Sequence, residues 1–158
     1  MPRRNDKLLL DTNLLVLLVI GLTDPMQIER FKRTRAYTRA DYELLRDFVN
    51  GYRALVTTPN VLTETSNLAG QLAEPLRGKA RAVLAGFVSG AEERYYASRS
   101  LTAQGLYIQL GLTHTAIKQA AGERVSILTD DLPLYGRLAS EGAEVFNFHH
   151  LRFQEPES

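Results

Sequence analysis

The sequence predicts an α/β fold in three layers, with a mainly parallel sheet and helices on both faces. Short apolar runs recur along the chain and are typical of buried strands, and each is followed by a segment with apolar residues at helical spacing. This alternation favours a parallel sheet, because each helix carries the chain back to the end where the next strand begins. We expect one domain over residues 1–158, with its core in 7–148 and a polar, loose tail in 149–158.

The first half of the chain begins with a strand and a buried helix. The run KLLLD (7–11) predicts a strand buried on both faces, and the apolar stretch 14–21 predicts a helix that ends at Gly21. Residues 24–40 are polar and predict a loop. The remaining elements of this half are a helix from Asp41 to near Gly51, a strand at 54–58, a helix capped by Thr58 with Pro59 in its first turn, and a helix from Pro75 onward.

The second half predicts helices and further strands. Residues 95–110 have no clear period, and we expect helix there. Thr113 suits the cap of a helix from His114 to Ala121 that Gly122 stops. After it, the pattern predicts a strand at 125–129, a helix at 132–141 ended by Gly142, and a strand at 144–148.

Composition limits the possible functions. The chain has no cysteine, which excludes disulfides, thiolate zinc sites and a cysteine nucleophile. Its formal charge of +1 does not indicate a nucleic-acid binder overall, so such a partner needs a local basic patch. The apolar run at 8–22 is shorter than the roughly 20 residues of a membrane-spanning helix, and it contains Asp11. No small-residue cleavage site follows it clearly, so we expect a cytoplasmic protein without a membrane segment.

Three acidic residues are candidates for a shared metal site. Asp11 follows the first predicted strand and Asp130 the third, and the carboxyl ends of parallel strands line the crevice where ligands bind. Glu64 lies on the border of the apolar stripe of the helix after the second strand, where we expect it to be half-buried. Carboxylates that converge in a crevice repel one another unless protons or cations neutralise them. Their oxygens suit Mg²⁺ or Mn²⁺.

Each acid also has a simpler interpretation. Asp11 can bond to the backbone of the turn DTN, and one of Asp130 and Asp131 can cap the helix that begins at 132. Glu64 alone is typical of a solvated helix residue. The combination of the three positions is more specific than any one of them.

Four segments resemble the PIN-domain nucleases, and together they span residues 7–148: LLLDTNLL, TTPNVLTETSNLA, GLTHTAI and ILTDDLPLYGRLASEGAEVFNF. The resemblance implies a three-layer α/β fold and metal-dependent hydrolysis of RNA phosphodiester bonds. The matched positions are Asp11 and Asp130 as the first and last metal-binding acids, Glu64 as the helix acid, Asp131 as an accessory acid, and Asn13 and Thr129 as supporting polar residues.

The size of the chain and its lack of further domains resemble the toxin branch of toxin–antitoxin pairs. This branch implies a small antitoxin partner that inserts a segment into the acidic crevice, and a homodimer. The mechanism that the resemblance implies uses one or two ions, about 3.5–4 Å apart where there are two, to activate a water molecule and to stabilise the leaving oxygen.

His114 departs from the family pattern, which has an aspartate in the motif that here reads GLTHTAI. A neutral imidazole suits Mn²⁺ or softer ions better than Mg²⁺, and a nearby helix N-terminus disfavours its cationic form. Three interpretations stay open: His114 binds a transition metal, it contacts an RNA phosphate or transfers a proton, or it marks a weakened site. The last leads to an alternative function, a PIN-like module that binds RNA or a protein partner with little or no cleavage.

The basic stretch RFKRTRAYTR (30–39) is the candidate RNA-binding segment. It contains no acid and carries the aromatic residues Phe31 and Tyr37. Such a run can bind backbone phosphates, and an aromatic ring can stack on a base. A solvated loop is the simpler interpretation. The expected phosphate contacts are Arg30, Lys32, Arg33, Arg35 and Arg39.

Acids at strand ends also occur in aspartyl-phosphate enzymes and receiver domains. Asn13 stands where the phosphatase motif needs a second aspartate, and the chain lacks the lysine that those proteins carry after a late strand. This class of function is therefore disfavoured.

Overall fold

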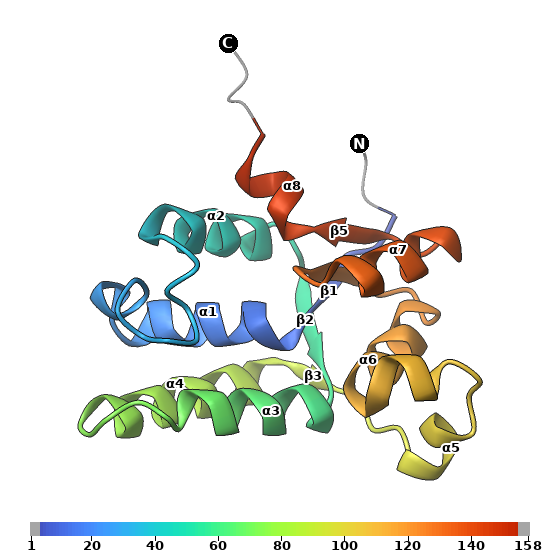
Figure 1. Ribbon diagram of the computed structural model, residues 1–158, viewed down its shortest axis with the longest axis horizontal. Helices are drawn as coiled ribbons and strands as arrows, with labels where there is room; N and C mark the ends of the chain where they lie inside the picture. The colour runs from blue at the N-terminus through green and yellow to red at the C-terminus, as the bar shows by residue number, and fades with distance from the viewer. Residues whose placement is uncertain (1–3, 155–158) are drawn as a thin grey trace.

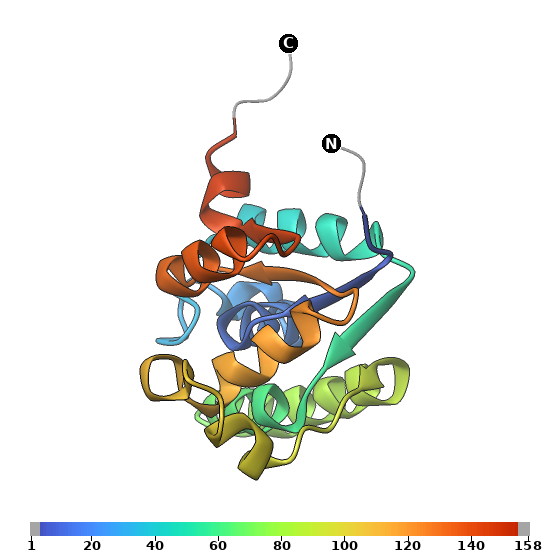
Figure 2. The same cartoon turned by 90° about the vertical axis from the view of Figure 1, so that its right-hand side faces the viewer.

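The computed structural model describes residues 4–154, and within them the chain forms three layers (Figure 1, Figure 2). In this part of the chain a five-stranded parallel sheet is the middle layer, with the order β3-β2-β1-β4-β5. The strands are β1 (Lys7–Leu10), β2 (Ala54–Thr57), β3 (Glu92–Glu93), β4 (Ser126–Thr129) and β5 (Val145–Asn147).

Helices cover both faces of the sheet (Figure 1). The chain reverses its direction across the sheet after β3, and right-handed crossovers then place the later helices on the opposite face. The predicted three-layer α/β fold class is confirmed, and it is consistent with a PIN-like fold. One face carries α1 (Thr12–Thr23), α2 (Arg39–Asn50), α3 (Pro59–Ala69) and α4 (Leu76–Gly90), and the other carries α5 (Ser98–Thr102), α6 (Tyr107–Ala121) and α7 (Leu132–Ser140).

Helix α1 is the centre of the core. Its residues from Leu14 to Gly21 are all buried, because α2, α3 and α4 pack against it. Gly21 makes this packing possible, since a Cβ there would come within 2.2 Å of the Tyr42 ring. Within residues 4–154, no helix combines the length and the apolar character that crossing a membrane requires.

The helices begin where the capping chemistry of the sequence places them. The Thr58 hydroxyl accepts a hydrogen bond from the Val61 amide at 3.2 Å, and Pro59 is in the first turn of α3, both as predicted. Helix α2 begins at Arg39, ahead of the predicted Asp41, because Thr38 and Asp41 form a reciprocal capping box.

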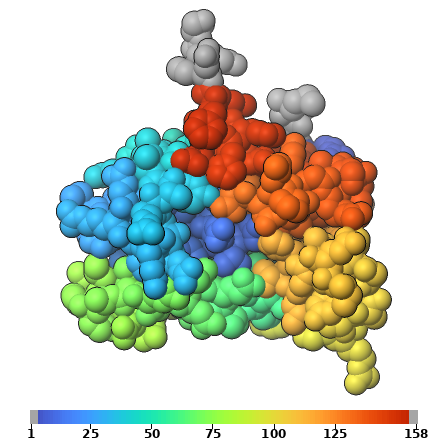
Figure 3. Space-filling model, in the orientation of Figure 1, coloured from blue at the N-terminus to red at the C-terminus, as the bar shows by residue number. Residues whose placement is uncertain are grey.

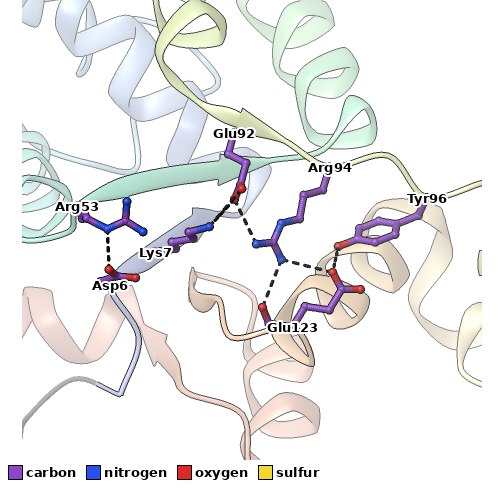
Figure 4. Close-up of polar contacts among 7 residues, drawn as sticks. All are labelled: Asp6, Lys7, Arg53, Glu92, Arg94, Tyr96 and Glu123. Carbon is purple, nitrogen blue, oxygen red and sulfur yellow. Dashed lines mark hydrogen bonds and ion pairs between the residues drawn. The ribbon is translucent and has the colours of Figure 1, made fainter.

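The edge strand β3 has no apolar pattern, and the sequence does not predict it. Polar contacts hold it in place (Figure 4). Glu92 lies 3.2 Å from Lys7 Nζ and 3.1 Å from an Arg94 guanidinium nitrogen. Arg94 also reaches Glu123, just before β4, and the Tyr96 hydroxyl donates to Glu123 at 3.0 Å. The network ties the edge strand to the starts of β1 and β4.

The predicted helix at 95–110 is only partly formed. Between α5 and α6 the chain is irregular, and Gly111, with φ 78° and ψ 175°, breaks α6 after its first turn. The predicted loose tail is also wrong in part, because Phe148–Arg152 forms α8 (Figure 1). Arg152 fixes α8 against α2 through an ion pair of 3.0 Å with Asp41. Residues 155–158 of that tail lie outside the described residues.

Candidate functional site

The strand order changes direction between β1 and β4, and such a switch point is where open parallel sheets bind ligands. The two strands pair with Leu10 beside Leu128, and the Asp11 amide extends the ladder to the Leu128 carbonyl at 3.0 Å. Asp11 and Asp130 therefore leave the sheet as neighbours. A pocket of about 120 Å³ lies at this edge and is lined by Asp11, Thr12, Asn13, Glu64, Leu68, His114, Asp130 and Asp131.

The surface is hollowed on this side of the molecule (Figure 3). Blue atoms of the N-terminal part of the chain form the floor of the hollow. The light-blue basic segment lies to its left, green helix α3 below it, and the orange segments of α6 and the β4–α7 turn to its right. The acids that the sequence places at separate strand ends line one pocket.

Asp11 is buried, with 4% of its surface exposed. Its Oδ1 accepts a hydrogen bond from the Thr12 amide at 2.7 Å and caps α1, while Oδ2 accepts one from the Thr129 hydroxyl at 2.7 Å. The simpler interpretation of Asp11, bonding within the turn, is therefore confirmed. It does not remove Asp11 from the pocket, which this carboxylate lines.

His114 lies beside Asp11, with its Nε2 3.4 Å from Asp11 Oδ2. The contact with Asp11 raises the pKa of His114 above its usual value in spite of partial burial, and the charges of Asp131 and Glu64 add to the rise. Burial opposes ionisation of Asp11, but His114 and Thr129 outweigh it and hold the pKa of Asp11 below its usual value. The expectation that the helix N-terminus disfavours the cationic ring is wrong, because an adjacent carboxylate acts more strongly.

Asp130 is held by side chains from two other parts of the chain. The Tyr37 hydroxyl donates a hydrogen bond to Asp130 Oδ2, and Asn13 Nδ2 lies 3.3 Å from the same oxygen. Burial, and then the bond to Asp130, raise the pKa of Tyr37, so the phenol keeps its proton and acts as the donor. No local pattern points to Tyr37, because 93 residues separate it from Asp130.

Asp131 is the residue that caps the helix at 132. Its Oδ1 accepts a hydrogen bond from the Leu134 amide at 2.8 Å, and its own amide donates to the Thr129 hydroxyl at 3.0 Å. Thr129 therefore connects Asp131 to Asp11. With one oxygen engaged in the cap, Asp131 lines the pocket beside Asp130.

Glu64 is exposed, and the expectation that it is half-buried is wrong. The buried stripe of α3 consists of Val61, Thr65 and Ala69, and Glu64 stands next to it on the open wall of the pocket. Its carboxylate accepts a hydrogen bond from the Thr113 hydroxyl. Thr113 thus bonds across to α3 and does not cap the helix that follows it, contrary to the sequence prediction.

The basic segment before α2 is a series of tight turns in which every third residue is buried. Amides bond to carbonyls three or four residues earlier, for example Thr34 to Phe31 at 3.0 Å and Tyr37 to Thr34 at 2.8 Å. Predicted base stacking by Phe31 or Tyr37 is wrong, because the two residues are buried, with exposures of only 8% and 6%. The buried positions are Ile28, Phe31, Thr34 and Tyr37.

The cationic side chains of this segment remain outside. Arg33 bonds to Gln71 at 2.9 Å, and Arg39, the first residue of α2, lies 3.7 Å from Glu43. The exposed cationic residues of the segment are Arg30, Lys32, Arg33, Arg35 and Arg39. The period of three in buried residues is the signal that predicts which side chains point outward.

The side chains around the pocket suit a hard divalent ion in their chemistry. They offer carboxylate oxygens, which Mg²⁺ and Mn²⁺ prefer, and 120 Å³ accommodates an ion with several water molecules. The Thr12 hydroxyl is buried at the pocket and has no hydrogen-bond partner among the described residues. A polar atom of this kind is normally satisfied by water or a ligand.

The acids are not arranged as a closed coordination group. Within residues 4–154, no three His, Asp or Glu side chains stand close enough together to hold one ion. Glu64 and Asp130 are turned toward the hydroxyls of Thr113 and Tyr37. These two acids must rotate if they are to share an ion with Asp11, whereas Asp11 itself is fixed.

Comparisons with known proteins identify no relative. No protein-family model matches the chain, and no curated protein matches it. The PIN-domain resemblance therefore remains a prediction from the motifs.

Proposed function

We propose that this protein is a divalent-metal-dependent endoribonuclease that hydrolyses RNA phosphodiester bonds at the acidic pocket. The observation that carries the proposal is the placement of Asp11, Glu64 and Asp130. Asp11 directly follows β1, Glu64 belongs to α3 and Asp130 directly follows β4, yet all three line one pocket at the switch point of the sheet. Such a gathering of carboxylates is favourable when a cation neutralises it.

The residues of the pocket have different tasks in this proposal. Asp11, fixed by the Thr12 amide and the Thr129 hydroxyl, is the rigid ligand, while Glu64 and Asp130 are the ligands that turn. Mg²⁺ or Mn²⁺ held by these carboxylates would supply an activated water molecule and would stabilise the charge that develops on phosphorus and the leaving oxygen. His114 lies 3.4 Å from Asp11, which raises the pKa of the imidazole, and in its protonated form His114 would attract the substrate phosphate.

The exposed cations of the segment 30–39 would draw RNA to the crevice. The light-blue segment that carries them lies beside the blue floor of the hollow (Figure 3), and the cationic side chains are exposed. Phosphate contacts of this type are independent of sequence and weaken as salt concentration rises. The segment therefore supports attraction of the RNA backbone, and the choice of cleavage site must come from other residues.

The finer assignment is a cytoplasmic toxin of a toxin–antitoxin pair, with a small antitoxin as partner and a homodimer as assembly. Its support is the sequence resemblance. The exposed Leu132, at 65%, adds an apolar surface next to Asp131, where a protein partner could cover the acidic crevice. A small reading frame beside the gene is the first observation to seek.

A second candidate is a PIN-like module that binds RNA or a protein partner with little cleavage. Two observations favour it. His114 Nε2 lies 3.4 Å from Asp11 Oδ2, and no closed metal-binding group exists within residues 4–154. In this candidate, the contact of His114 with the Asp11 carboxylate takes the place of a metal ion.

RNA cleavage in the presence of Mg²⁺ or Mn²⁺ separates the two candidates. The variants are Asp11→Asn, which removes the charge of the fixed ligand, and Asp47→Asn, which removes an exposed carboxylate on α2 as a control. We expect cleavage by the parent and by Asp47→Asn, and a loss of at least about a hundredfold in Asp11→Asn, since the metal supplies several kcal/mol of the catalysis.

Cleavage that survives in Asp11→Asn would contradict the metal mechanism. If the parent and both variants bind RNA but none of them cuts it with either ion, the binding module is the function.

A further inference from the structure

A second, larger cavity adjoins the acidic pocket. It is a groove of about 620 Å³ between the start of α3 and the bend in α6. Glu64 and His114 belong to the walls of both cavities, so the groove opens directly onto the candidate metal site. The remaining walls include Pro59, Asn60 and Thr63 of α3 and Tyr107, Leu112 and Thr113 of α6.

The groove is built into the backbone at Gly111. A φ of 78° is reached easily only by glycine, and it turns the segment with Tyr107 away from the helix that carries His114. No heavy atom lies within 4 Å of the place that a Cβ of Gly111 would occupy. The open space beside the bend is therefore a feature of the chain path and does not depend on one side-chain rotamer.

The groove offers both flat apolar surfaces and unused polar groups. The Tyr107 ring, Pro59 and Leu112 supply the apolar surfaces. The amide of Asn60 and the hydroxyls of Thr63 and Tyr107 make no side-chain hydrogen bond with any described residue, although each residue is a wall of the groove. An amide carries donors and an acceptor side by side, which matches the edge of a nucleobase.

We propose that this groove binds the nucleobase next to the scissile phosphate of a single-stranded RNA. The inference rests on the proposed function, because that function places the phosphate at the acidic pocket. The groove, between α3 and α6, then receives the adjoining base, and the basic segment on the opposite side of the hollow receives the backbone (Figure 3). The base must be unpaired, because its face and its edge both contact protein.

A nucleobase suits the groove better than a peptide does. The walls contain neither lysine nor arginine, and no residue of the edge strands β3 and β5 lines them, so an extended peptide in the groove would find no strand to pair with. A planar ring, by contrast, can stack on Tyr107 while Asn60 bonds its edge. The volume of 620 Å³ is within the usual range of small-molecule pockets, about 300–1,000 Å³.

Two-dimensional NMR tests the proposal on the full chain with Mg²⁺ present. The ligands are the four nucleoside 5′-monophosphates, with ribose 5-phosphate as the control that has a phosphate and no base. We expect at least one nucleotide to shift the amide signals of residues 60–64 and 107–114, and ribose 5-phosphate to leave residues 107–112 unchanged. Asn60→Ala should weaken the binding of that nucleotide about fivefold, which is the effect of losing one neutral hydrogen bond.

Asn67→Ala is the matched control, because it makes the same change on an exposed position of α3 outside the groove. Equal affinities of Asn60→Ala and Asn67→Ala would overturn the proposal, as would equal effects of ribose 5-phosphate and the nucleotides. The proposal would also be overturned if no nucleotide shifts the amide signals of the groove but an apolar peptide with one arginine does. That result would assign the surface to a protein partner.

The test is independent of cleavage. If nucleotides bind in the groove but the protein does not cleave RNA in the presence of Mg²⁺ or Mn²⁺, the nuclease is refuted and the base site is supported. Metal-dependent cleavage with the same base preference in the parent and Asn60→Ala would support the nuclease and refute the base site.

Discussion

The hydroxyl of Tyr37 donates a hydrogen bond to the carboxylate of Asp130, although the two residues are 93 positions apart. Tyr37 is itself fixed by its surroundings, because the Arg152 guanidinium lies 4.8 Å from the centre of its ring and the Phe148 ring meets it edge-on at 5.8 Å. Residues of α8 thus hold Tyr37, and Tyr37 in turn bonds to Asp130 at the candidate metal site. Tyr37 is a positioning residue, which sets the direction of the Asp130 carboxylate.

Replacing Tyr37 by phenylalanine tests this role. Tyr37→Phe keeps the ring and removes the donor, so we expect the free energy of unfolding to fall by about 1.5–3 kcal/mol, the range for hydrogen bonds to charged groups. We also expect Mn²⁺ to bind about tenfold more tightly, because Asp130 must turn away from Tyr37 to share an ion with Asp11 and the variant has no such hydrogen bond to break. Urea denaturation and calorimetric titration measure the two effects. Unchanged Mn²⁺ affinity would show that Tyr37 has only a structural role.

His114→Asp tests what the histidine does to the site. The new carboxylate would face Asp11 at close range, so the metal-free protein should unfold at a lower temperature than the parent. Mg²⁺ should restore stability and bind about tenfold more tightly than to the parent, since the ion gains a negatively charged oxygen ligand. His114→Asn, which is neutral, is the control. Equal Mg²⁺ affinity in the two variants would contradict this account of His114.

The ion pair between Asp41 and Arg152 predicts a loss of stability in acid. Burial opposes ionisation of Asp41, but the hydrogen bonds from Arg152 and Thr38 prevail and lower its pKa. Its stabilising effect is therefore complete above the unfolded pKa of about 3.9 and disappears as pH falls through the lower folded pKa. The difference in unfolding free energy between the parent and Asp41→Asn should be constant above about pH 5 and shrink below about pH 4.

Urea denaturation at a series of pH values measures that difference. Asp47→Asn, on the same helix and exposed, is the reference variant. If the difference in unfolding free energy between the parent and Asp41→Asn grows as the pH falls, the pKa of Asp41 is not lowered in the folded protein.

The packing of α1 predicts that Gly21 tolerates no side chain. In Gly21→Ala the new Cβ would lie 2.2 Å from Cδ2 of Tyr42, and we expect a loss of about 1–3 kcal/mol or more from overpacking. Gly86→Ala on α4 is the matched control, because no atom lies within 4 Å of its Cβ position. There, alanine should stabilise the helix by about 0.5–1 kcal/mol. Similar thermal unfolding of the two variants would contradict the packing.

The features that the sequence predicts are those with local causes. Thr58 and Asp131 cap their helices because each side chain bonds to an amide three residues later, and such spacing is visible in the sequence. The apolar runs of β1 and β4 predict buried strands, and their ends place Asp11 and Asp130 at one edge of the sheet.

The features that it misses depend on contacts between distant segments. Strand β3 is held by Lys7 and Arg94 and has no apolar signal of its own. The sequence predicts Thr113 as a helix cap, but in the structure its hydroxyl bonds to Glu64 of α3. The raised pKa of His114 likewise follows from its contact with Asp11. The sequence does not show that these two residues lie close together.

The most direct test of the central claim is calorimetric titration of the parent with Mn²⁺, repeated for Asp11→Asn, Asp130→Asn and the control Asp47→Asn. If the pocket between β1 and β4 binds the ion, the parent and Asp47→Asn should share one affinity, and the other two variants should lose at least about tenfold. Equal binding of Mn²⁺ by all four proteins, or none by the parent, would contradict a metal site at Asp11 and Asp130.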